Sequence, residues 1–156
     1  MQTDPNFANY RFQPETGRIV LLDFGATRDI DEKIAKLYGR ILVAGLQQDR
    51  EAMRAHVLEL GLITDGTEAA HAARIVAMVD MLFAELTAAP ILDFGTTDLP
   101  RRMQAEGMAL AEDGFVPPPL PIDALFLQRK FGGMFLLAAR LKAQVPVCGM
   151  LETYLK

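Results

Sequence analysis

The feature that most constrains the fold is helical periodicity, which runs through nearly all of the chain after Arg28. Apolar residues recur there every three or four positions, the spacing that places them on one face of an α-helix. The first such segment, which Asp29 or Asp31 can cap, carries Ile30, Ile34, Leu37, Tyr38, Ile41 and Leu42. The pattern therefore predicts a mainly α-helical fold.

Capping and turn residues divide this region into separate helices. Asp49 should cap the second helix, and Gly61 should end it. Further helices are expected over residues 67–88, 97–112 and 123–142, with a short terminal helix after Pro146. Four prolines make residues 114–122 an extended connection, and Asp123 is expected to cap the helix that follows. Gly132 and Gly133 lie in the middle of that helix, which predicts a close helix contact there.

The first 28 residues follow a different pattern. Residues 10–12 and 18–22 predict two short strands. The segment between them, Gln13-Pro14-Glu15-Thr16-Gly17, has an early proline and a late glycine, as a turn requires. A hairpin of these strands would set Asp23 opposite Asn9, with residues 1–9 as a loop before it.

Three polar residues around this hairpin have a spacing typical of phosphoryl-transfer sites. Asn9 follows Asp4 by five positions, and Asp23 opens a D-F-G tripeptide one hairpin further on. Phosphoryl transfer needs an acidic group at the attacking oxygen and oxygen ligands for the Mg²⁺ ions that bridge the phosphates. Asp4 is therefore the candidate catalytic residue, and Asn9 and Asp23 are the candidate metal ligands. No cofactor-binding residue is assigned beyond these metal ligands.

A lone D-F-G is a weak signal, because the chain contains a second copy at Asp93-Phe94-Gly95. No Asp-x4-Asn pattern precedes that copy, and we interpret it as a loop coincidence. Asp and Asn also favour turns and helix caps. The prediction therefore depends on the combination of Asp4, Asn9 and Asp23 rather than on any one of them.

The residues around these motifs resemble the AarF-domain (UbiB-like) atypical kinases, especially the branch that supports coenzyme Q biosynthesis. The matching segments are Gln2-Thr3-Asp4-Pro5-Asn6 with Asn9, Leu21-Leu22-Asp23-Phe24-Gly25-Ala26-Thr27-Arg28, Val116-Pro117-Pro118-Pro119 and Arg129-Lys130-Phe131-Gly132-Gly133. The resemblance implies the helical C-terminal lobe of the protein-kinase-like fold, with a small N-terminal β-hairpin. Residues 1–156 would form a single domain, in which residues 1–28 hold the catalytic loop, hairpin and D-F-G and residues 29–156 form a helical bundle.

The resemblance also implies a reaction, the Mg²⁺-dependent use of ATP in support of ubiquinone biosynthesis. Family members begin upstream with an alanine-rich nucleotide loop, a lysine on an early strand and its glutamate partner. The similarity covers only the later part of such a domain. The 156 residues are therefore expected to need an N-terminal lobe or partner chain for ATP, and to be inactive alone.

Departures from ordinary protein kinases favour ATP hydrolysis or a small-molecule acceptor over protein phosphorylation. Gln2-Thr3 stands where His-Arg usually precedes the aspartate, and no Ala-Pro-Glu follows Gly25. Two other interpretations stay open. The chain is also compatible with small-molecule phosphotransferases of the aminoglycoside and choline kinase type, which share Asp-x4-Asn and a later metal aspartate. The other is a non-catalytic helical interaction module that retains a relic motif.

Composition limits the partners. A net charge of −4 with no basic stripe argues against nucleic acid, and the single Cys148 excludes a disulfide framework. Residues 69–89 carry an apolar surface wide enough for burial or, alternatively, for contact with a membrane surface or a ubiquinone-biosynthesis protein. An exposed inter-lobe surface would favour homodimers. The resemblance implies a cytoplasmic or peripheral inner-membrane location in a bacterium, or the mitochondrial matrix side in a eukaryote.

Overall fold

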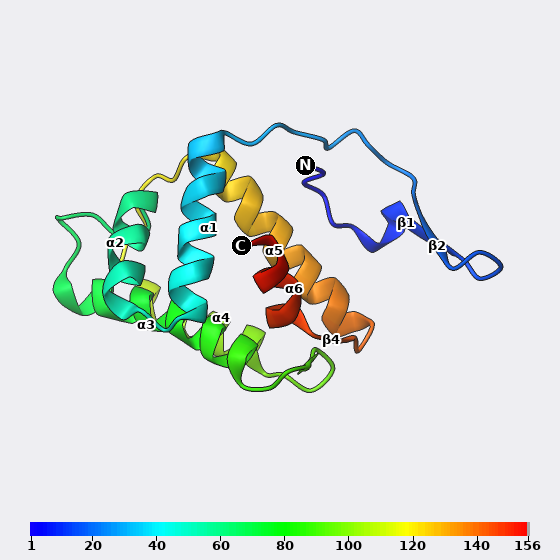
Figure 1. Cartoon of the computed structure of the whole chain (residues 1–156). Coiled ribbons are helices and arrows are strands. Elements are labelled where there is room, and N and C mark those ends of the chain that lie inside the picture. The colour runs from blue at the N-terminus through cyan, green and yellow to red at the C-terminus, as the bar shows by residue number, and fades with distance from the viewer. Residues whose placement is uncertain (156) are drawn as a thin grey trace.

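The computed structural model describes residues 1–155, in which six α-helices follow an N-terminal segment (Figure 1). The helices are α1 (Glu32–Leu46), α2 (Arg50–Leu60), α3 (Ala69–Thr87), α4 (Leu99–Glu112), α5 (Ile122–Arg140) and α6 (Val147–Tyr154). The mainly α-helical prediction is confirmed. None of these helices, within the described residues, has the length and apolar character needed to cross a membrane.

The predicted caps explain where the first two helices begin and end. Asp31, rather than Asp29, caps α1, because its carboxylate accepts a hydrogen bond from the Lys33 amide at 2.8 Å. Asp49 accepts in the same way from the Ala52 amide at 3.0 Å. α2 ends at Gly61, whose φ of 89° lies in the left-handed region that glycine adopts without strain.

The core lies where α1, α2 and α3 pack together. Met53, Val57 and Ile63 are its most fully buried large side chains. At Gly45 of α1 an added Cβ would overlap the Phe83 ring of α3, so the glycine permits the close approach of the two helices. The core also takes up the wide apolar surface of α3, whose buried residues are Ala72, Ile75, Val76, Phe83 and Leu86. Burial is therefore the interpretation that the structure supports for this surface.

Two small antiparallel sheets complete the fold. The predicted hairpin forms from β1 (Tyr10–Gln13) and β2 (Arg18–Leu21), and it projects away from the helices in Figure 1. The second sheet pairs β3 (Leu92–Asp93) with β4 (Gln144–Val145). The sequence predicted no strand after Arg28, and this is wrong here, because strands of two residues are too short to show periodicity in the sequence.

Helix α5 begins differently from the prediction. Pro121 occupies the position before the helix, and no side chain caps it. The expectation that Asp123 would be the cap is wrong, because its carboxylate is taken by other partners. Asp123 accepts hydrogen bonds from the Arg28 guanidinium at 2.9 Å and from the Asp31 amide at 2.8 Å. Asp123 thus connects α5 to the segment that leads into α1.

Candidate functional site

The loop that carries Asp4 is paired with the segment that follows Asp23. The Thr3 amide donates to the Ala26 carbonyl at 2.9 Å, and the Arg28 amide donates to the Met1 carbonyl at 2.8 Å. The Thr3 side chain is buried and its hydroxyl also donates to the Ala26 carbonyl, at 2.7 Å. These bonds fix the two segments side by side, although they are more than twenty residues apart.

The hairpin brings Asn9 close to Asp23 along the backbone. Tyr10 lies opposite Leu21 in the sheet, and the Leu22 amide extends the pairing by donating to the Asn9 carbonyl at 2.8 Å. Asp23 is the next residue, and its Oδ1 accepts a hydrogen bond from the Gly25 amide at 2.7 Å. The hairpin therefore pairs Asn9 with Leu22, the residue that precedes Asp23.

Asp4 is held at both of its carboxylate oxygens. The Asn9 side-chain amide donates to Asp4 Oδ2 at 3.3 Å. The Arg129 guanidinium, on α5, donates to Asp4 Oδ1 at 3.1 Å. The structure thus links Asp4 to Asn9 directly, while Asn9 and Asp23 are neighbours only through the backbone pair.

The chemistry of these side chains suits a hard cation. Carboxylate and amide oxygens are ligand types that Mg²⁺ binds. Mg²⁺ usually takes one or two carboxylates from the protein, together with waters and substrate phosphates. No cluster of three or more His, Cys, Asp or Glu side chains within residues 1–155 has the arrangement of a metal site. The candidate ligands Asn9 and Asp23 each carry a side-chain oxygen of a type that Mg²⁺ binds.

The comparisons with known proteins identify the family. The ABC1 atypical kinase-like domain matches residues 1–57, the part of the chain that contains Asp4, Asn9 and Asp23. The mitochondrial atypical kinase COQ8 of Schizosaccharomyces pombe is 33% identical over 162 residues, which cover 99% of this chain and 26% of that protein. The mitochondrial atypical kinase COQ8B of Danio rerio is also 33% identical, over 99% of this chain and 24% of that protein.

This chain belongs to the ABC1 atypical kinase-like family. The mitochondrial atypical kinase coq-8 of Caenorhabditis elegans is 34% identical, over 96% of this chain and 20% of that protein. The chain thus spans about a quarter or less of the length of these curated relatives. The helical C-terminal lobe of a kinase-like fold, with its small hairpin, is confirmed.

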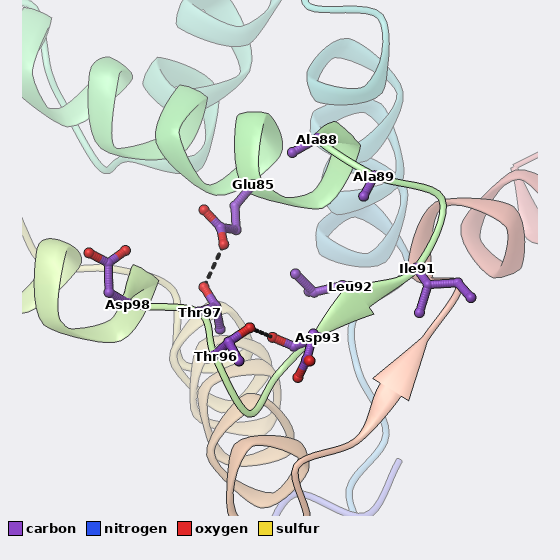
Figure 2. Close-up of a pocket in the computed structure, with 9 residues that line it drawn as sticks. All are labelled: Glu85, Ala88, Ala89, Ile91, Leu92, Asp93, Thr96, Thr97 and Asp98. Atoms are coloured by element: carbon purple, nitrogen blue, oxygen red, sulfur yellow. Dashed lines mark hydrogen bonds between the residues drawn. The ribbon is translucent and has the colours of Figure 1, made fainter.

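The second D-F-G of this ABC1-family chain lies in a different sheet. The Asp93 carboxylate accepts hydrogen bonds from the Gly95 amide at 2.8 Å and from the Gln144 side chain at 3.2 Å. Within residues 1–155 it shares no hydrogen bond with the N-terminal segment. Asp93 instead borders a shallow pocket of about 300 Å³. Figure 2 shows Glu85, Asp93 and Asp98 around it, with Thr97 donating to Glu85 at 2.6 Å.

Cys148 lies apart from the ABC1-family motif. Its thiol donates to the Leu86 carbonyl at 2.9 Å, and the side chain packs against the helical core. Burial, and after it the nearby Glu152, raises the pKa of the Cys148 thiol. A thiol that stays protonated is a poor nucleophile, so Cys148 behaves as a small core residue.

Arg129 is the residue at this site that sequence reasoning missed. It belongs to a segment whose sequence resembles the AarF-domain kinases, but the resemblance assigned no role to it. Asp4 and Arg129 are 125 positions apart, and no local periodicity connects residues so distant in the sequence. The signal that the sequence offered was an arginine within one helical turn of two glycines, in the middle of a predicted helix.

Proposed function

We propose that these residues are the C-terminal lobe of an ATP-using atypical kinase or ATPase, forming one domain. Residues 1–28 would carry the catalytic loop, hairpin and D-F-G, and residues 29–156 the helical support. Asp4 is the proposed catalytic base or water-positioning group, and Asn9 and Asp23 are the proposed Mg²⁺ ligands. One observation carries the proposal, namely the pairing of the two motif segments through Leu22 with Asn9 and Thr3 with Ala26.

Side-chain oxygens of Asn9 and Asp23 that accept no hydrogen bond support their proposed role as metal ligands. Asp23 Oδ1 accepts the Gly25 amide, whereas no residue within 1–155 donates a hydrogen bond to Asp23 Oδ2. Asn9 Oδ1 likewise accepts no hydrogen bond from residues 1–155, and the side-chain nitrogen of Asn9 is the atom that donates to Asp4. When bound, Mg²⁺ would neutralise charge on the phosphates. The chain's own contribution would be two side-chain oxygens, from Asn9 and from the residue that follows its backbone partner Leu22.

The Asp4 carboxylate is accessible and keeps lone pairs for an attacking oxygen. Its side chain is 32% exposed, so water or a substrate hydroxyl can reach it. Asn9 and Arg129 each use one carboxylate oxygen, and a carboxylate has about four lone-pair sites. Asp4 can therefore hold a nucleophile by a hydrogen bond, and accept its proton, without losing either contact.

ATP binding is expected to need more than these 156 residues. A chain of net charge −4 repels the phosphates, and kinase-like sites pair them with a lysine from another lobe. Positioning and charge neutralisation supply most of the catalysis in phosphoryl transfer. We therefore propose that these residues alone do not turn over ATP, and that their partner is an N-terminal lobe or a chain that supplies one.

The biological setting follows from the resemblance and from the names of the relatives. We propose that the whole protein supports ubiquinone biosynthesis by hydrolysing ATP or by transferring phosphate to a small molecule. The relatives are named as mitochondrial atypical kinases, which supports a mitochondrial location in a eukaryote, and the matrix side is the place that we propose there. In a bacterium the corresponding place is the cytoplasm or the inner-membrane surface.

The two D-F-G copies provide the test. We would join the chain to the N-terminal lobe of the fission yeast relative and compare Asp23→Asn with Asp93→Asn. MgATP should raise the melting temperature of the parent and of Asp93→Asn, because Asp23 is a proposed metal ligand and Asp93 is not. Asp23→Asn should lose most of that shift and most of the ATPase rate. Equal behaviour of the two variants, or ATP turnover by the unjoined chain above its own Asp23→Asn background, would overturn the proposal.

A further inference from the structure

Helix α5 contacts the proposed catalytic loop through three nearby residues. Arg129 reaches Asp4 at 3.1 Å, and the Lys130 ammonium donates to the Gln2 side chain at 3.3 Å. Gly133 lies against the Pro5 ring. Positions 129 and 133 are one helical turn apart and share a face. One face of α5 therefore meets the loop at Asp4 and at the residue that follows it.

The contact at Gly133 is closer than any side chain allows. A Cβ added to Gly133 would overlap Pro5 Cγ and lie 3.2 Å and 3.3 Å from two other ring atoms. A Cβ added to Gly132 would meet nothing within 4 Å. The expectation of a close helix contact is therefore corrected, because the partner is the loop rather than a helix. Gly133 alone needs to be glycine for this reason.

We propose that Arg129 is a positioning residue for Asp4, and that α5 is the rigid support on which the loop is set. The role of Asp4 rests on the function proposed above. Residues 1–6 contain no helix of their own, so the orientation of the Asp4 carboxylate depends on groups brought to it. The Asn9 side-chain amide is one such group, five residues further along the chain. Arg129 supplies the other from a 19-residue helix anchored elsewhere in the fold.

The Arg129–Asp4 ion pair is exposed, so its effect on the position of Asp4 can be measured apart from any effect on stability. The Arg129 side chain is 63% exposed and the Asp4 side chain 32%. Ion pairs of this exposure contribute little to folding stability. Loss of Arg129 should therefore change the orientation of Asp4, and the rate that depends on it, while leaving the unfolding transition of the chain in place.

The first experiment measures the support itself, on the 156-residue chain without nucleotide. Gly133→Ala and Gly132→Ala make the same change to the same helix, and only the first creates an overlap. Hydrogen exchange at the Thr3 and Leu22 amides, which bond across the two motif segments, should speed up about tenfold in Gly133→Ala. Gly132→Ala should exchange as the parent does. Equal exchange in both variants would overturn the role of α5 as the support.

The second experiment measures the position of Asp4 by a spectroscopic signal. The Asn9 side-chain amide donates to Asp4 Oδ2, so its NMR resonance reports the orientation of the carboxylate. Arg129→Gln should shift that resonance, Arg129→Lys should partly restore it, and the remote control Arg101→Gln should leave it unchanged. An unshifted resonance in Arg129→Gln would overturn the proposal, whatever the activity of the protein.

A kinetic arm connects this position to the rate. In the chain joined to an N-terminal lobe, Arg129→Gln should lower kcat about tenfold with an unchanged KM for ATP. The melting temperature should stay that of the parent. A fall in kcat that follows a loss of stability would indicate a merely structural role. If the joined protein hydrolyses no ATP at all, the proposed function fails, and the exchange and NMR results still decide the inference about Arg129 and α5.

Discussion

The two D-F-G segments of this chain have the same sequence and the same local turn, yet different surroundings. In residues 23–25 and in residues 93–95 the aspartate Oδ1 accepts the glycine amide, at 2.7 Å and 2.8 Å. The phenylalanines differ sharply, because Phe24 is 66% exposed and Phe94 is 9% exposed. The tripeptide thus determines the turn, while the segments that pair with it determine whether the turn forms part of the core.

Helix α5 contacts the parts of the chain around both copies, but with different kinds of interaction. The Phe135 ring of α5 packs edge-on against Phe94 with the ring centroids 4.9 Å apart. Next to the first copy, Asp123 of α5 holds Arg28 and the Asp31 amide through polar bonds at the surface. Buried apolar contacts stabilise the whole fold, whereas exposed polar contacts mainly fix local position. The first copy is therefore held by polar contacts outside the core, and the second by contacts within it.

The largest expected effect tests this difference at the phenylalanines. Phe94→Ala should lower the free energy of unfolding by about 3 kcal/mol, because it leaves a cavity beside Phe135. Phe24→Ala removes an exposed side chain and should change it by less than about 0.5 kcal/mol. Urea unfolding of both variants measures the comparison. Similar losses in the two variants would mean that the first copy also belongs to the core.

The elements with strong local signals were predictable from the sequence. The hairpin, the caps at Asp31 and Asp49 and the end of α2 at Gly61 depend on residues close in the sequence, whose preferences act over one turn. The proposed site also follows from local spacing, since Asn9 and Asp23 flank one hairpin. The structure brings Asp4 against Asn9, and the roles assigned to the three residues stay predictions.

The features that were missed depend on contacts between distant residues. Asp123 looked like a helix cap because it stands at the start of a helix, but Arg28 and Asp31 occupy its carboxylate from 95 and 92 positions away. Strand β3 pairs with a strand more than fifty residues later. The contact of Gly133 with Pro5 likewise joins the middle of α5 to the N-terminal loop. Such pairs form only in the folded molecule, and a single sequence carries no local pattern for them.

A smaller effect is expected at the two glycines. A Cβ at Gly95 would lie 3.0 Å from Lys142 Cβ and 3.1 Å from Asp93 Oδ1, whereas a Cβ at Gly25 would meet only the Asp23 carboxylate, at 3.1 Å. Lys142 Cβ cannot move without its backbone, so Gly95→Ala should cost about 1 kcal/mol of stability. Gly25→Ala should cost less than about 0.5 kcal/mol, because the exposed Asp23 side chain can turn aside. Thermal unfolding of the pair checks the difference, and a larger loss at Gly25 would contradict it.

The smallest effect concerns the polar attachment beside the first copy and its dependence on pH. The Asp31 amide, and after it the Arg28 guanidinium, hold the pKa of Asp123 below its ordinary value of 3.8. A carboxyl group whose pKa is lowered by folding stabilises the folded state above its unfolded pKa, and this contribution is lost as the pH falls through the folded pKa. The parent should therefore be slightly more stable than Asp123→Asn at about pH 7, and this difference should disappear as the pH falls through the folded pKa of Asp123.

Hydrogen exchange can locate this pH effect within the chain. Asp123→Asn should speed exchange at the Arg28 amide, which bonds the Met1 carbonyl, because the guanidinium of Arg28 loses its charged partner. Exchange at the Phe94 amide, which bonds the Ala143 carbonyl in the second sheet, should stay unchanged because that region is held by apolar burial. The matched control is Asp29→Asn, which removes one nearby charge but no hydrogen bond or ion pair within residues 1–155. A stability difference that persists in acid would contradict the role of the Asp123 charge. Faster exchange at the Phe94 amide would show that the two regions are coupled through α5 rather than held by independent contacts.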